Sequence, residues 1–544
     1  MRLLCFLSIF LLLSCDPREK RAALDSTLTQ PAQLILRNAT IYTVDRARSL
    51  ASAIAIRDGR IAFVGSEKGV EAYIGPKTNI KDLDGKLVLP GFFQRVKVRG
   101  SAGKINLFSG KSIEDYCLSV SRYIRENPQQ QVIVGEGWNM QAFSGEPPHK
   151  GILDQINDLI PIILFSSDGN NIWTNSEGLA AAGIDSDTEN PRGGVIEKNE
   201  HGLATGWLHG RGAKDLLQRL IPENSSSNYR DDLLRIQRLA TRNGITTLYE
   251  AALHSVDEIS WKNYKDQLST IGAMDIRLRT SWPVSADFTD KEFLLLQQRI
   301  GQIRSDDFSV DSVSFIGWAA EIAETQNVKD RAASQDYSQG VVADLARRAN
   351  HFNLPLQIVV SGKEFTASAL EALESLKPLG SDSILRNVII NASFDRVDLQ
   401  RLAQANTVLF IQPETMFAHN MALFRVSQED ELKVQKKYFP LGFSLLSADL
   451  SANHAMVNPL EVIKQGLVYK IPVSEMIAAF TINAAYAGGL EKETGSLEAG
   501  KWADFIVLDR NMFGLEESEQ RGLKVLETFY KGQLVFDINN EYEN

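Results

Sequence analysis

Histidine and cysteine are scarce in this chain, which has 7 histidines and 3 cysteines in 544 residues. Cys5 and Cys15 lie near the start, so Cys117 stands alone in the body and no disulfide can form there. An excess of basic charge is also missing, because 58 Lys and Arg against 68 Asp and Glu give a formal net charge of −10. We expect no nucleic-acid partner, since such proteins need basic surfaces to neutralise phosphates.

The composition is that of a globular protein. Apolar residues make up 44% of the chain and charged residues 23%, which excludes disordered, collagen-like and coiled-coil classes. The length is enough for a large barrel with a smaller second domain. After the first residues, no apolar run reaches the length of a transmembrane helix.

The first 15 residues read as an export signal. Arg2 precedes the apolar run 3–13, which is too short to span a bilayer stably, and Ser14-Cys15 follows. This end resembles the lipobox of bacterial lipoproteins, which implies a lipid on Cys15, a flexible tether over 16–31 and a place in the cell envelope. The lipid would then be the only membrane contact. Plain secretion with an incidental Cys15 is the alternative.

Short β-type runs occur at both ends of the chain. They occupy residues 32–89, where Asp58-Gly59 predicts a two-residue hairpin, and residues 495–540. We therefore predict one small β-sandwich built from both ends. Between them, strand and helix patterns alternate over 90–494, with an inserted α/β segment at about 105–240. This alternation predicts an α/β fold with a parallel sheet covered by helices, either a barrel or an open sheet.

Several motifs in this middle part resemble the amidohydrolase superfamily, and together they resemble its amidohydrolase 3 family, which includes N-substituted formamide deformylases. The resemblance covers about residues 33–536. Its motifs are Leu83-Asp84-Gly85-Lys86-Leu87-Val88-Leu89-Pro90-Gly91-Phe92, Gly135-Glu136-Gly137-Trp138, Asp168-Gly169, Gly193-Gly194-Val195-Ile196, Gly244-Ile245-Thr246-Thr247, Thr481-Ile482-Asn483-Ala484-Ala485, and Gly495-Ser496-Leu497-Glu498-Ala499-Gly500-Lys501-Trp502-Ala503-Asp504.

The resemblance implies a distorted (β/α)8 barrel of the TIM type with a small β-sandwich. It also implies zinc or another divalent metal, which makes hydroxide from bound water for the hydrolysis of non-peptide C–N bonds. The family places a His-x-His pair on the first barrel strand, where this chain has Val96 and Val98. The other ligand positions of the family fall at or near Asn170, Tyr249, Ser314, Ser361 and Asn391. Only the aspartate of the eighth strand is kept, as Asp449.

The size of the metal's contribution decides how we interpret these replacements. Without the metal, the pKa of the attacking water rises by about nine units, which removes roughly 12 kcal/mol of activation at neutral pH. A single general base supplies about 10²–10⁴-fold, or about 3–5 kcal/mol. Asp449 alone cannot replace the metal, so we interpret it as a relic of the family site and predict no cofactor.

Other residues suggest further possibilities near the old site. Glu414, His419, Asp449 and His454 could form a relocated metal site, because imidazoles and carboxylates suit zinc. Asp168, Asn170 and Asn391 could hydrogen-bond a small polar or amide-like ligand, with Ser314 and Ser361 beside them. Trp138, Trp173 and Trp318 either line such a pocket or fill the core.

Arg95, Lys97 and Arg99 alternate with the two valines of the first barrel strand. If the valines keep the orientation of the metal ligands, the three cations point to the helix layer or lie exposed and paired. A shifted register would instead turn them toward the cavity, where they could hold an anion. We favour the exposed or paired arrangement, since unpaired charges are rarely buried.

Two functional hypotheses follow. In the first, the protein is a lipid-anchored pseudo-hydrolase whose metal site has decayed and whose barrel binds a small polar ligand or a partner. In the second, it is an active C–N hydrolase with a remodelled site. The second hypothesis requires a bound metal and the first does not.

Overall fold

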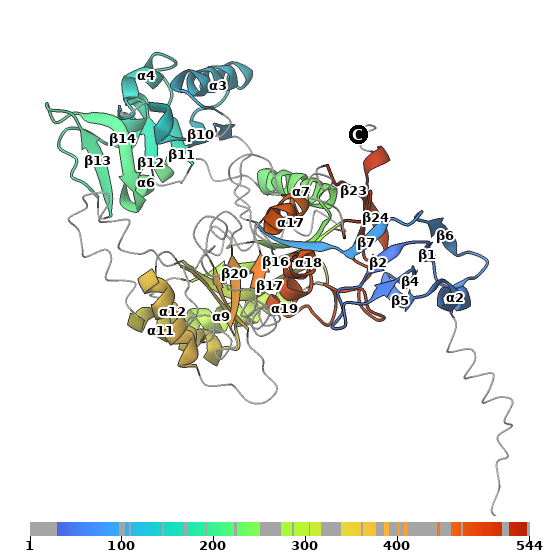
Figure 1. The fold of residues 1–544 in the computed structure, drawn as a ribbon. Helices are drawn as coiled ribbons and strands as arrows, with labels where there is room; N and C mark the ends of the chain where they lie inside the picture. Colours follow the sequence, from blue (N-terminus) through green and yellow to red (C-terminus); the bar gives the residue numbers. More distant parts are fainter. Residues whose placement is uncertain are drawn as a thin grey trace, which may run out of the picture.

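The computed structural model describes most of the chain, and every statement about structure below concerns the residues that it describes. These are residues 30–96, 104–107, 110–143, 146–167, 171–191, 193–221, 226–250, 274–284, 288–303, 305–316, 339–360, 363–376, 386–390, 401, 407–411, 443–445, 458–468, 472–513 and 522–540. They form a β-sandwich, a parallel sheet with covering helices, and a separate α/β unit (Figure 1).

The β-sandwich consists of two sheets. One has the strand order β5-β4-β1-β6 and comprises β1 (Leu34–Arg37), β4 (Ala53–Arg57), β5 (Arg60–Gly65) and β6 (Asn79–Asp82). The other has the order β24-β23-β22-β7-β2-β3 and comprises β2 (Thr40–Tyr42), β3 (Leu50–Ala51), β7 (Leu87–Pro90), β22 (Phe505–Leu508), β23 (Val525–Tyr530) and β24 (Gln533–Asp537). The short helices α2 (Glu67–Val70), η1 (Glu71–Tyr73) and η5 (Ile538–Asn540) complete these two regions.

Both ends of the chain build this sandwich, as the sequence predicts. Strand β22 pairs antiparallel with β7, so Ile506 lies opposite Leu89. The hydrophobic core between the sheets joins Ile41 of the N-terminal part with Phe505 and Phe529 of the C-terminal part. The predicted hairpin at Asp58-Gly59 links β4 and β5 with φ angles of +51° and +75°, the left-handed backbone that such tight turns need.

The barrel sheet has eight parallel strands in the order β21-β20-β19-β18-β17-β16-β15-β8. They are β8 (Phe92–Val96), β15 (Ile245–Glu250), β16 (Arg277–Pro283), β17 (Phe308–Ile316), β18 (Leu356–Val359), β19 (Asn387–Ile390), β20 (Thr407–Ile411) and β21 (Phe443–Leu445). Within the described residues, the outer strands β8 and β21 do not pair with each other. The curled parallel sheet and the two-ended sandwich confirm the predicted fold class.

Helices cover one face of this sheet. They are α7 (Ser226–Arg242), α9 (Asp290–Ile303), α11 (Gln339–His351), α12 (Lys363–Glu374), α17 (Pro459–Val468) and α18 (Val473–Phe480). Leu278 of β16 and Ile358 of β18 share a buried apolar core with Phe293 of α9 and Leu345 of α11. Helix α19 (Ile482–Ala487) lies on the other face of the sheet, where Ala484 packs against β8 and β15.

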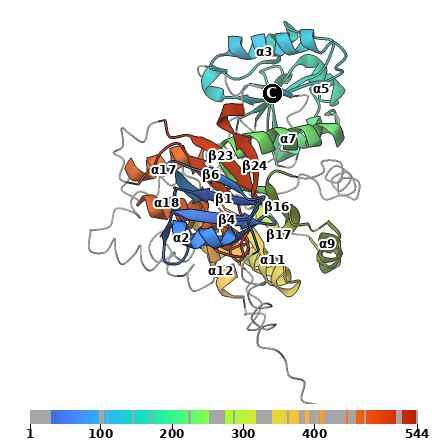
Figure 2. The same ribbon diagram turned by 90° about the vertical axis from the view of Figure 1, so that its right-hand side faces the viewer.

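The separate α/β unit has a six-stranded sheet of order β13-β14-β12-β11-β10-β9. Its elements are β9 (Lys104–Asn106), α3 (Ile113–Glu126), β10 (Ile133–Trp138), η2 (Met140–Phe143), α4 (Lys150–Asp154), β11 (Ile162–Ser166), β12 (Asn171–Thr174), α5 (Ser176–Ala181), β13 (Gly194–Lys198), β14 (Ala204–Gly210) and α6 (Arg211–Gln218). Each face of this sheet has its own apolar core. Figures 1 and 2 place the unit beside the barrel.

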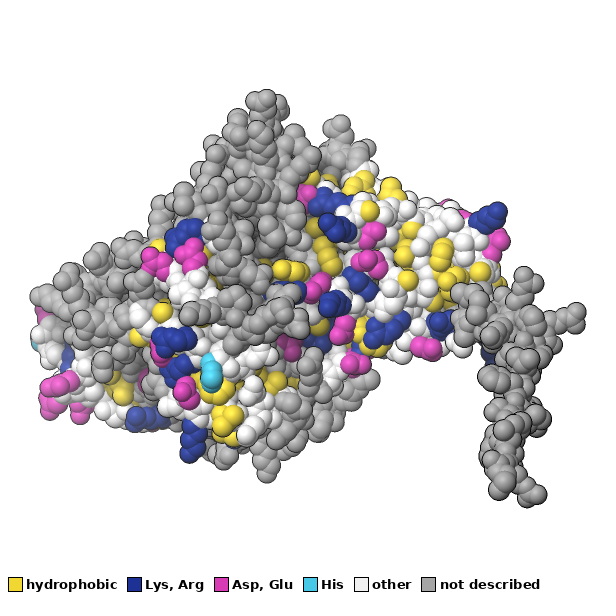
Figure 3. Space-filling view, turned by 90° about the horizontal axis from the view of Figure 1, so that it is seen from below, with side chains coloured by type: hydrophobic (Ala, Val, Ile, Leu, Met, Phe, Trp, Pro, Cys, Tyr) yellow, Lys and Arg dark blue, Asp and Glu magenta, His cyan; other side chains and the backbone are white. Residues whose placement is uncertain are grey.

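One view of the surface shows how the charges of the described residues are distributed. In the view of Figure 3, basic and acidic side chains are interspersed over the described part of the molecule. No described helix combines the length and the apolar character needed to cross a membrane.

Candidate functional site

The two faces of the barrel sheet differ in what covers them. Phe92 and Leu248 pack in the large core with residues of α7, so they mark the face that the helices cover. Phe93 and Tyr249 pack with Ala484 of α19 on the opposite face. We call this opposite face the inner face, because it corresponds to the inside of a barrel closed by helices.

Two rows of residues cross the inner face from β8 to β16. The ladder pairs Phe93 with Thr247 and Thr247 with Arg277, which forms the first row. Arg95 pairs with Tyr249 and Tyr249 with Arg279, which forms the second row. Because the strands are parallel, the second row lies nearer to their carboxyl ends, where barrel enzymes place their working residues.

The orientation that we favoured for Arg95 is wrong. Its neighbour Gln94 pairs with Leu248, which faces the helices, and Gln94 is fully buried. Side chains alternate along a strand, so Arg95 belongs to the inner face and Val96 has the parity of Gln94. A bulge in β15 between Ile245 and Thr247 sets this register. The structure therefore matches the shifted-register alternative, in which a cation turns inward.

Arg95 has an unusual electrostatic environment. Its Nε atom is buried and has no hydrogen-bond partner. The residue is partly buried, and this burial lowers the pKa of the guanidinium to about 10, because a charge removed from water loses part of its hydration. No ion pair to Arg95 forms within the part of the chain that the structure describes. Lys97 and Arg99 lie outside the described residues.

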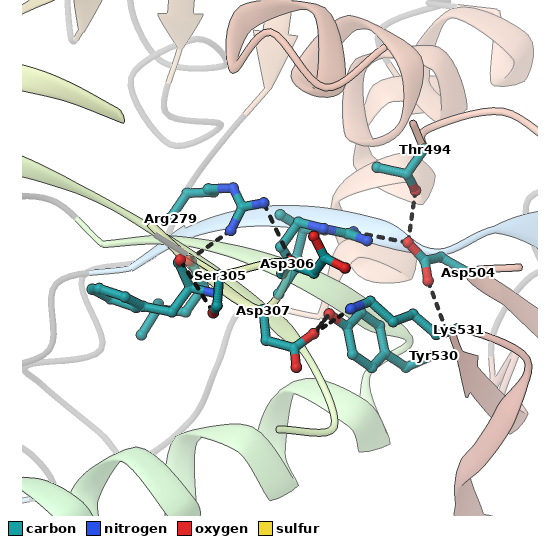
Figure 4. A network of polar contacts seen from close by, with 12 residues as sticks. Arg279, Ser305, Asp306, Asp307, Thr494, Asp504, Tyr530 and Lys531 are labelled. Atoms are coloured by element: carbon teal, nitrogen blue, oxygen red, sulfur yellow. Dashed lines mark hydrogen bonds and ion pairs between the residues drawn. The ribbon is translucent and has the colours of Figure 1, made fainter. Parts of the chain in front are cut away.

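Arg277 is held by an ion pair with Asp504, which precedes β22 of the β-sandwich. Figure 4 shows Asp504 with Thr494 and Lys531 beside it. Arg277 Nη1 donates to Asp504 Oδ2 at 2.8 Å and to Thr247 Oγ1 at 3.2 Å. Asp504 also accepts hydrogen bonds from Thr494 Oγ1 at 2.8 Å and from the Lys531 amide at 2.9 Å. Although burial opposes it, the Asp504 carboxylate raises the pKa of Arg277. This pair fixes the barrel to the sandwich.

Arg279 is also paired. Its Nε lies 3.1 Å from Asp311 Oδ2, and its Nη2 donates to the Asp306 carbonyl at 3.3 Å. Burial lowers the pKa of Arg279, and Asp311 opposes that shift without cancelling it. Next to this group, Asp307 accepts hydrogen bonds from Tyr530 and Lys531, each at 2.6 Å (Figure 4). The carboxylates of Asp504 and Asp311 explain why the cations of Arg277 and Arg279 can be buried here.

Tyr249 stands where the family resemblance leads us to expect a histidine. Its ring stacks on Phe93 with centroids 6.2 Å apart, and both pack with Ala484, Ala485 and Leu490. Burial, together with the nearby Asp311 carboxylate, raises the pKa of Tyr249, so the phenol stays neutral. We call Phe93, Tyr249, Ala484, Ala485 and Leu490 the apolar floor of the inner face.

Ser314 is the one predicted pocket residue whose side chain the structure describes within the barrel sheet. It is buried, and its Oγ has no hydrogen-bond partner. It alternates with Val313 and Phe315, which pack in the helix-covered core, so Ser314 belongs to the inner face. The preceding inner residue, Ser312, accepts a hydrogen bond from Gln357 at 2.7 Å.

Trp138 and Trp173 of the separate α/β unit are core residues, which agrees with the core alternative for these two side chains. Both are fully buried in one apolar cluster with Phe143. Trp138 Nε1 donates to the Leu164 carbonyl at 2.8 Å, and Trp173 Nε1 donates to the His149 carbonyl at 3.0 Å. Their polar atoms are thus used inside the core.

The remaining predicted site residues fall outside the description. They are Cys15, Val98, Asp168, Asn170, Trp318, Ser361, Asn391, Glu414, His419, Asp449 and His454. For Val96 the structure describes the backbone alone. Among the described residues, no group of three or more His, Cys, Asp and Glu could hold a metal ion.

Sequence reasoning missed two polar pairs. Arg277 and Asp504 are far apart in sequence, and the alternation of Arg277 with Arg279 along a strand is the one signal that could have indicated an inward charge. In the α/β unit, His209 Nε2 lies 2.8 Å from Glu197 Oε1, because the two strands β13 and β14 are adjacent. No spacing motif in the sequence marks that pair.

Comparison with known proteins identifies the family. The model of the amidohydrolase family Amidohydro_3 matches residues 79–433 and 466–536, so this chain belongs to that family. N-substituted formamide deformylase of Arthrobacter pascens is 25% identical, covering 94% of this chain and 99% of the relative. Protein LONG AFTER FAR-RED 3 of Arabidopsis thaliana is 27% identical, covering 94% and 93%.

Solved structures share the fold. An uncharacterized metal-dependent hydrolase from Pyrococcus horikoshii has a TM-score of 0.64 at 18% identity and covers 89% of this chain and 99% of its own. The corresponding hydrolase from Pyrococcus furiosus has the same TM-score and identity and covers 88% and 99%. These likenesses concern the fold. The family supports a metal-dependent hydrolase ancestry for the chain.

Proposed function

We propose that this protein is a lipid-anchored pseudo-hydrolase of the amidohydrolase family, whose barrel binds a small polar ligand without a metal. The observation that carries this proposal is the inward position of Arg95 on the first barrel strand. The family's hydrolases need a cation on this side of the sheet, and this chain puts a cationic side chain there instead.

The metal of the family does not fit the described residues. The sequence replaces the His-x-His pair by Val96 and Val98, which have no lone pair for a metal. A divalent cation at about 6 Å from an arginine would be repelled by about 5–6 kcal/mol at an effective dielectric constant of about 20. Arg277 and Arg279 add further positive charge on the same face, although carboxylates pair with them.

Metal analysis tests the proposal directly. The full chain is purified after growth with added zinc, its metals are measured by mass spectrometry, and hydrolysis of N-substituted formamides is assayed. The Arthrobacter deformylase, prepared in parallel, is the positive control. We expect no stoichiometric metal and no hydrolysis. About one equivalent of metal, with hydrolysis that a chelator abolishes, would refute the proposal and establish the remodelled hydrolase.

The lipid anchor is a separate part of the proposal. It rests on the run 3–13 followed by Ser14-Cys15. We expect labelled palmitate to be incorporated into the wild-type protein and not into Cys15→Ser. The variant Cys117→Ser is the matched control and should be labelled like wild type. Labelling of Cys15→Ser, or none of wild type, would contradict the anchor.

A further inference from the structure

The charges on the inner face do not balance. The first three strands place three arginines there, namely Arg95, Arg277 and Arg279. Two carboxylates pair with these arginines among the described residues, Asp504 with Arg277 and Asp311 with Arg279. The described part of the inner face therefore carries one positive charge more than the carboxylates that pair with it.

The two paired arginines have carboxylate partners that compensate their charge. The Nε and Nη2 atoms of Arg277 have no hydrogen-bond partner, but its side chain is fully enclosed. Arg277 is completely buried, and its Nη1 is shared between Asp504 and Thr247. Arg279 binds the Asp306 carbonyl and the Asp311 carboxylate. Both pairs tie the strand β16 to elements beside it, so their charges are already compensated.

Arg95 differs from Arg277 in its row, and from Arg279 of the same row in having no carboxylate partner among the described residues. It is one pleat further along β8 than Phe93, which belongs to the apolar floor. The floor closes the inner face with side chains that offer Arg95 no counter-charge. Arg95 therefore lies above an apolar surface and toward the carboxyl ends of the strands, where ligands of barrel proteins bind.

Arg95 as a whole is partly buried, and its Nε atom is fully buried. A cation in such a place is costly when no counter-charge compensates it, and the described residues supply none. The buried Nε of Arg95 still has a hydrogen to donate. A guanidinium is planar and presents its donors as a fork that matches the two oxygens of a carboxylate or phosphate. A neutral amide could accept one hydrogen bond but would leave the charge uncompensated.

We infer that the small ligand of this barrel is an anion, and that its carboxylate or phosphate group binds the guanidinium of Arg95 above the apolar floor. This inference deepens the proposed function and rests on it. It predicts a ligand with a charged oxyanion at one end. Any apolar part of the ligand would pack toward Phe93 and Tyr249, which form the adjacent floor.

Matched probes separate charge from shape. N-acetylglycine carries a carboxylate and an amide, whereas N-acetylglycinamide is neutral and almost the same size. Inorganic phosphate and acetate test which oxyanion is preferred. Each is titrated into the full chain at constant ionic strength and followed by calorimetry. We expect N-acetylglycine, acetate or phosphate to bind with a Kd of about 1 mM or tighter, and N-acetylglycinamide to bind at least about tenfold more weakly.

Three variants locate the binding group. Arg95→Met keeps the length of the side chain without its charge, and it should weaken anion binding at least about tenfold. Arg95→Lys should restore part of the binding, because it returns the charge without the fork. Arg347→Met removes a positive charge from an exposed position of α11, where the side chain is 68% exposed, and should bind like wild type.

Stability without ligand gives a second readout that a merely structural arginine would not produce. In a buffer without oxyanions, Arg95→Met should unfold at a temperature equal to or above that of wild type, because it removes a charge that has no carboxylate partner in the described part of the chain. Added anion should raise the unfolding temperature of wild type and leave that of Arg95→Met unchanged. Circular dichroism checks that the variant is folded.

Several outcomes overturn the inference. They are equal binding of N-acetylglycine and N-acetylglycinamide, unchanged anion binding by Arg95→Met, no binding of any oxyanion probe, and a lower unfolding temperature for Arg95→Met in the absence of anions. The metal and hydrolysis measurements test the proposed function separately. A protein that contains no metal, does not hydrolyse the substrates and does not bind anions would refute the anion site but remain consistent with the absence of a metal-dependent hydrolase activity.

Discussion

The buried ion pair between Arg277 and Asp504 predicts a large loss of stability when one partner becomes neutral. The two side chains are 0% and 1% exposed, and the charged atoms are 2.8 Å apart. The Nε and Nη2 atoms of Arg277 have no hydrogen-bond partner, so Asp504 is the main compensation for its charge. The variant Asp504→Asn keeps the size of the side chain and can still accept a hydrogen bond.

The magnitude follows from these contacts. Breaking a buried pair while one charge remains costs about 3–5 kcal/mol. Asp504 also accepts from Thr494 and from the Lys531 amide, and losing one of these two bonds adds about 1 kcal/mol. Asp344 is the control: its side chain is 42% exposed and pairs with Arg347 at 2.9 Å and with Arg348 at 2.8 Å. Because these pairs are solvated, Asp344→Asn should cost at most about 1 kcal/mol.

Urea denaturation followed by tryptophan fluorescence measures these differences. We expect the midpoint of Asp504→Asn to fall by about 1 M or more relative to wild type, and that of Asp344→Asn to change little. The double variant Arg277→Met/Asp504→Asn should recover most of the loss, because no unpaired charge stays buried. The reasoning is refuted if Asp504→Asn behaves like Asp344→Asn, or if the double variant is no more stable than Asp504→Asn.

Two further predictions concern the end of α19. Burial favours the neutral acid of Glu491, but hydrogen bonds from Arg386 at 2.6 and 2.7 Å hold the pKa of Glu491 below its usual value. The stability that this pair contributes is therefore present above about pH 4.3 and is lost as the pH falls further. The variant Glu491→Gln should therefore differ most from wild type in unfolding temperature near pH 7 and least near pH 3, and a constant difference would contradict the assignment. A Cβ on Gly488 would lie 1.3 Å from the Tyr249 hydroxyl, so Gly488→Ala should lower the free energy of unfolding by about 1–3 kcal/mol or more. An unchanged unfolding temperature in calorimetry would rule out this contact.

Local sequence patterns are sufficient for much of this fold. The hairpin at Asp58-Gly59 is predictable because two residues determine its backbone. The barrel strands are predictable because each is a short apolar run between turn signals. The joining of both chain ends in one sandwich followed from β-type runs at each end, and the pairing of β7 with β22 bears it out.

The direction of Arg95 could not be predicted in the same way. A strand's two faces exchange when its register moves by one residue, and the register of β8 depends on the bulge in β15. That bulge involves Ile245 and Thr247, about 150 residues further along the chain. The partner of Arg277 was equally difficult to predict, because Asp504 lies 227 residues further along the chain and belongs to a motif that carries the family resemblance.

The arrangement of these charges separates two requirements of the fold. The pair of Arg277 and Asp504 lies in the first row, toward the beginning of the strands, and joins the barrel to the sandwich. Arg95 lies in the second row, toward the carboxyl ends of the strands. The contact between the barrel and the sandwich does not require a charge at this position. On the function and the anion site proposed above, a barrel with valines at the metal-ligand positions of the family and an inward arginine prefers an anion to a cation, while the pair of Arg277 and Asp504 stays intact. On this reasoning, variants at Arg95 should alter binding without loosening the joint, and variants at Asp504 should do the reverse.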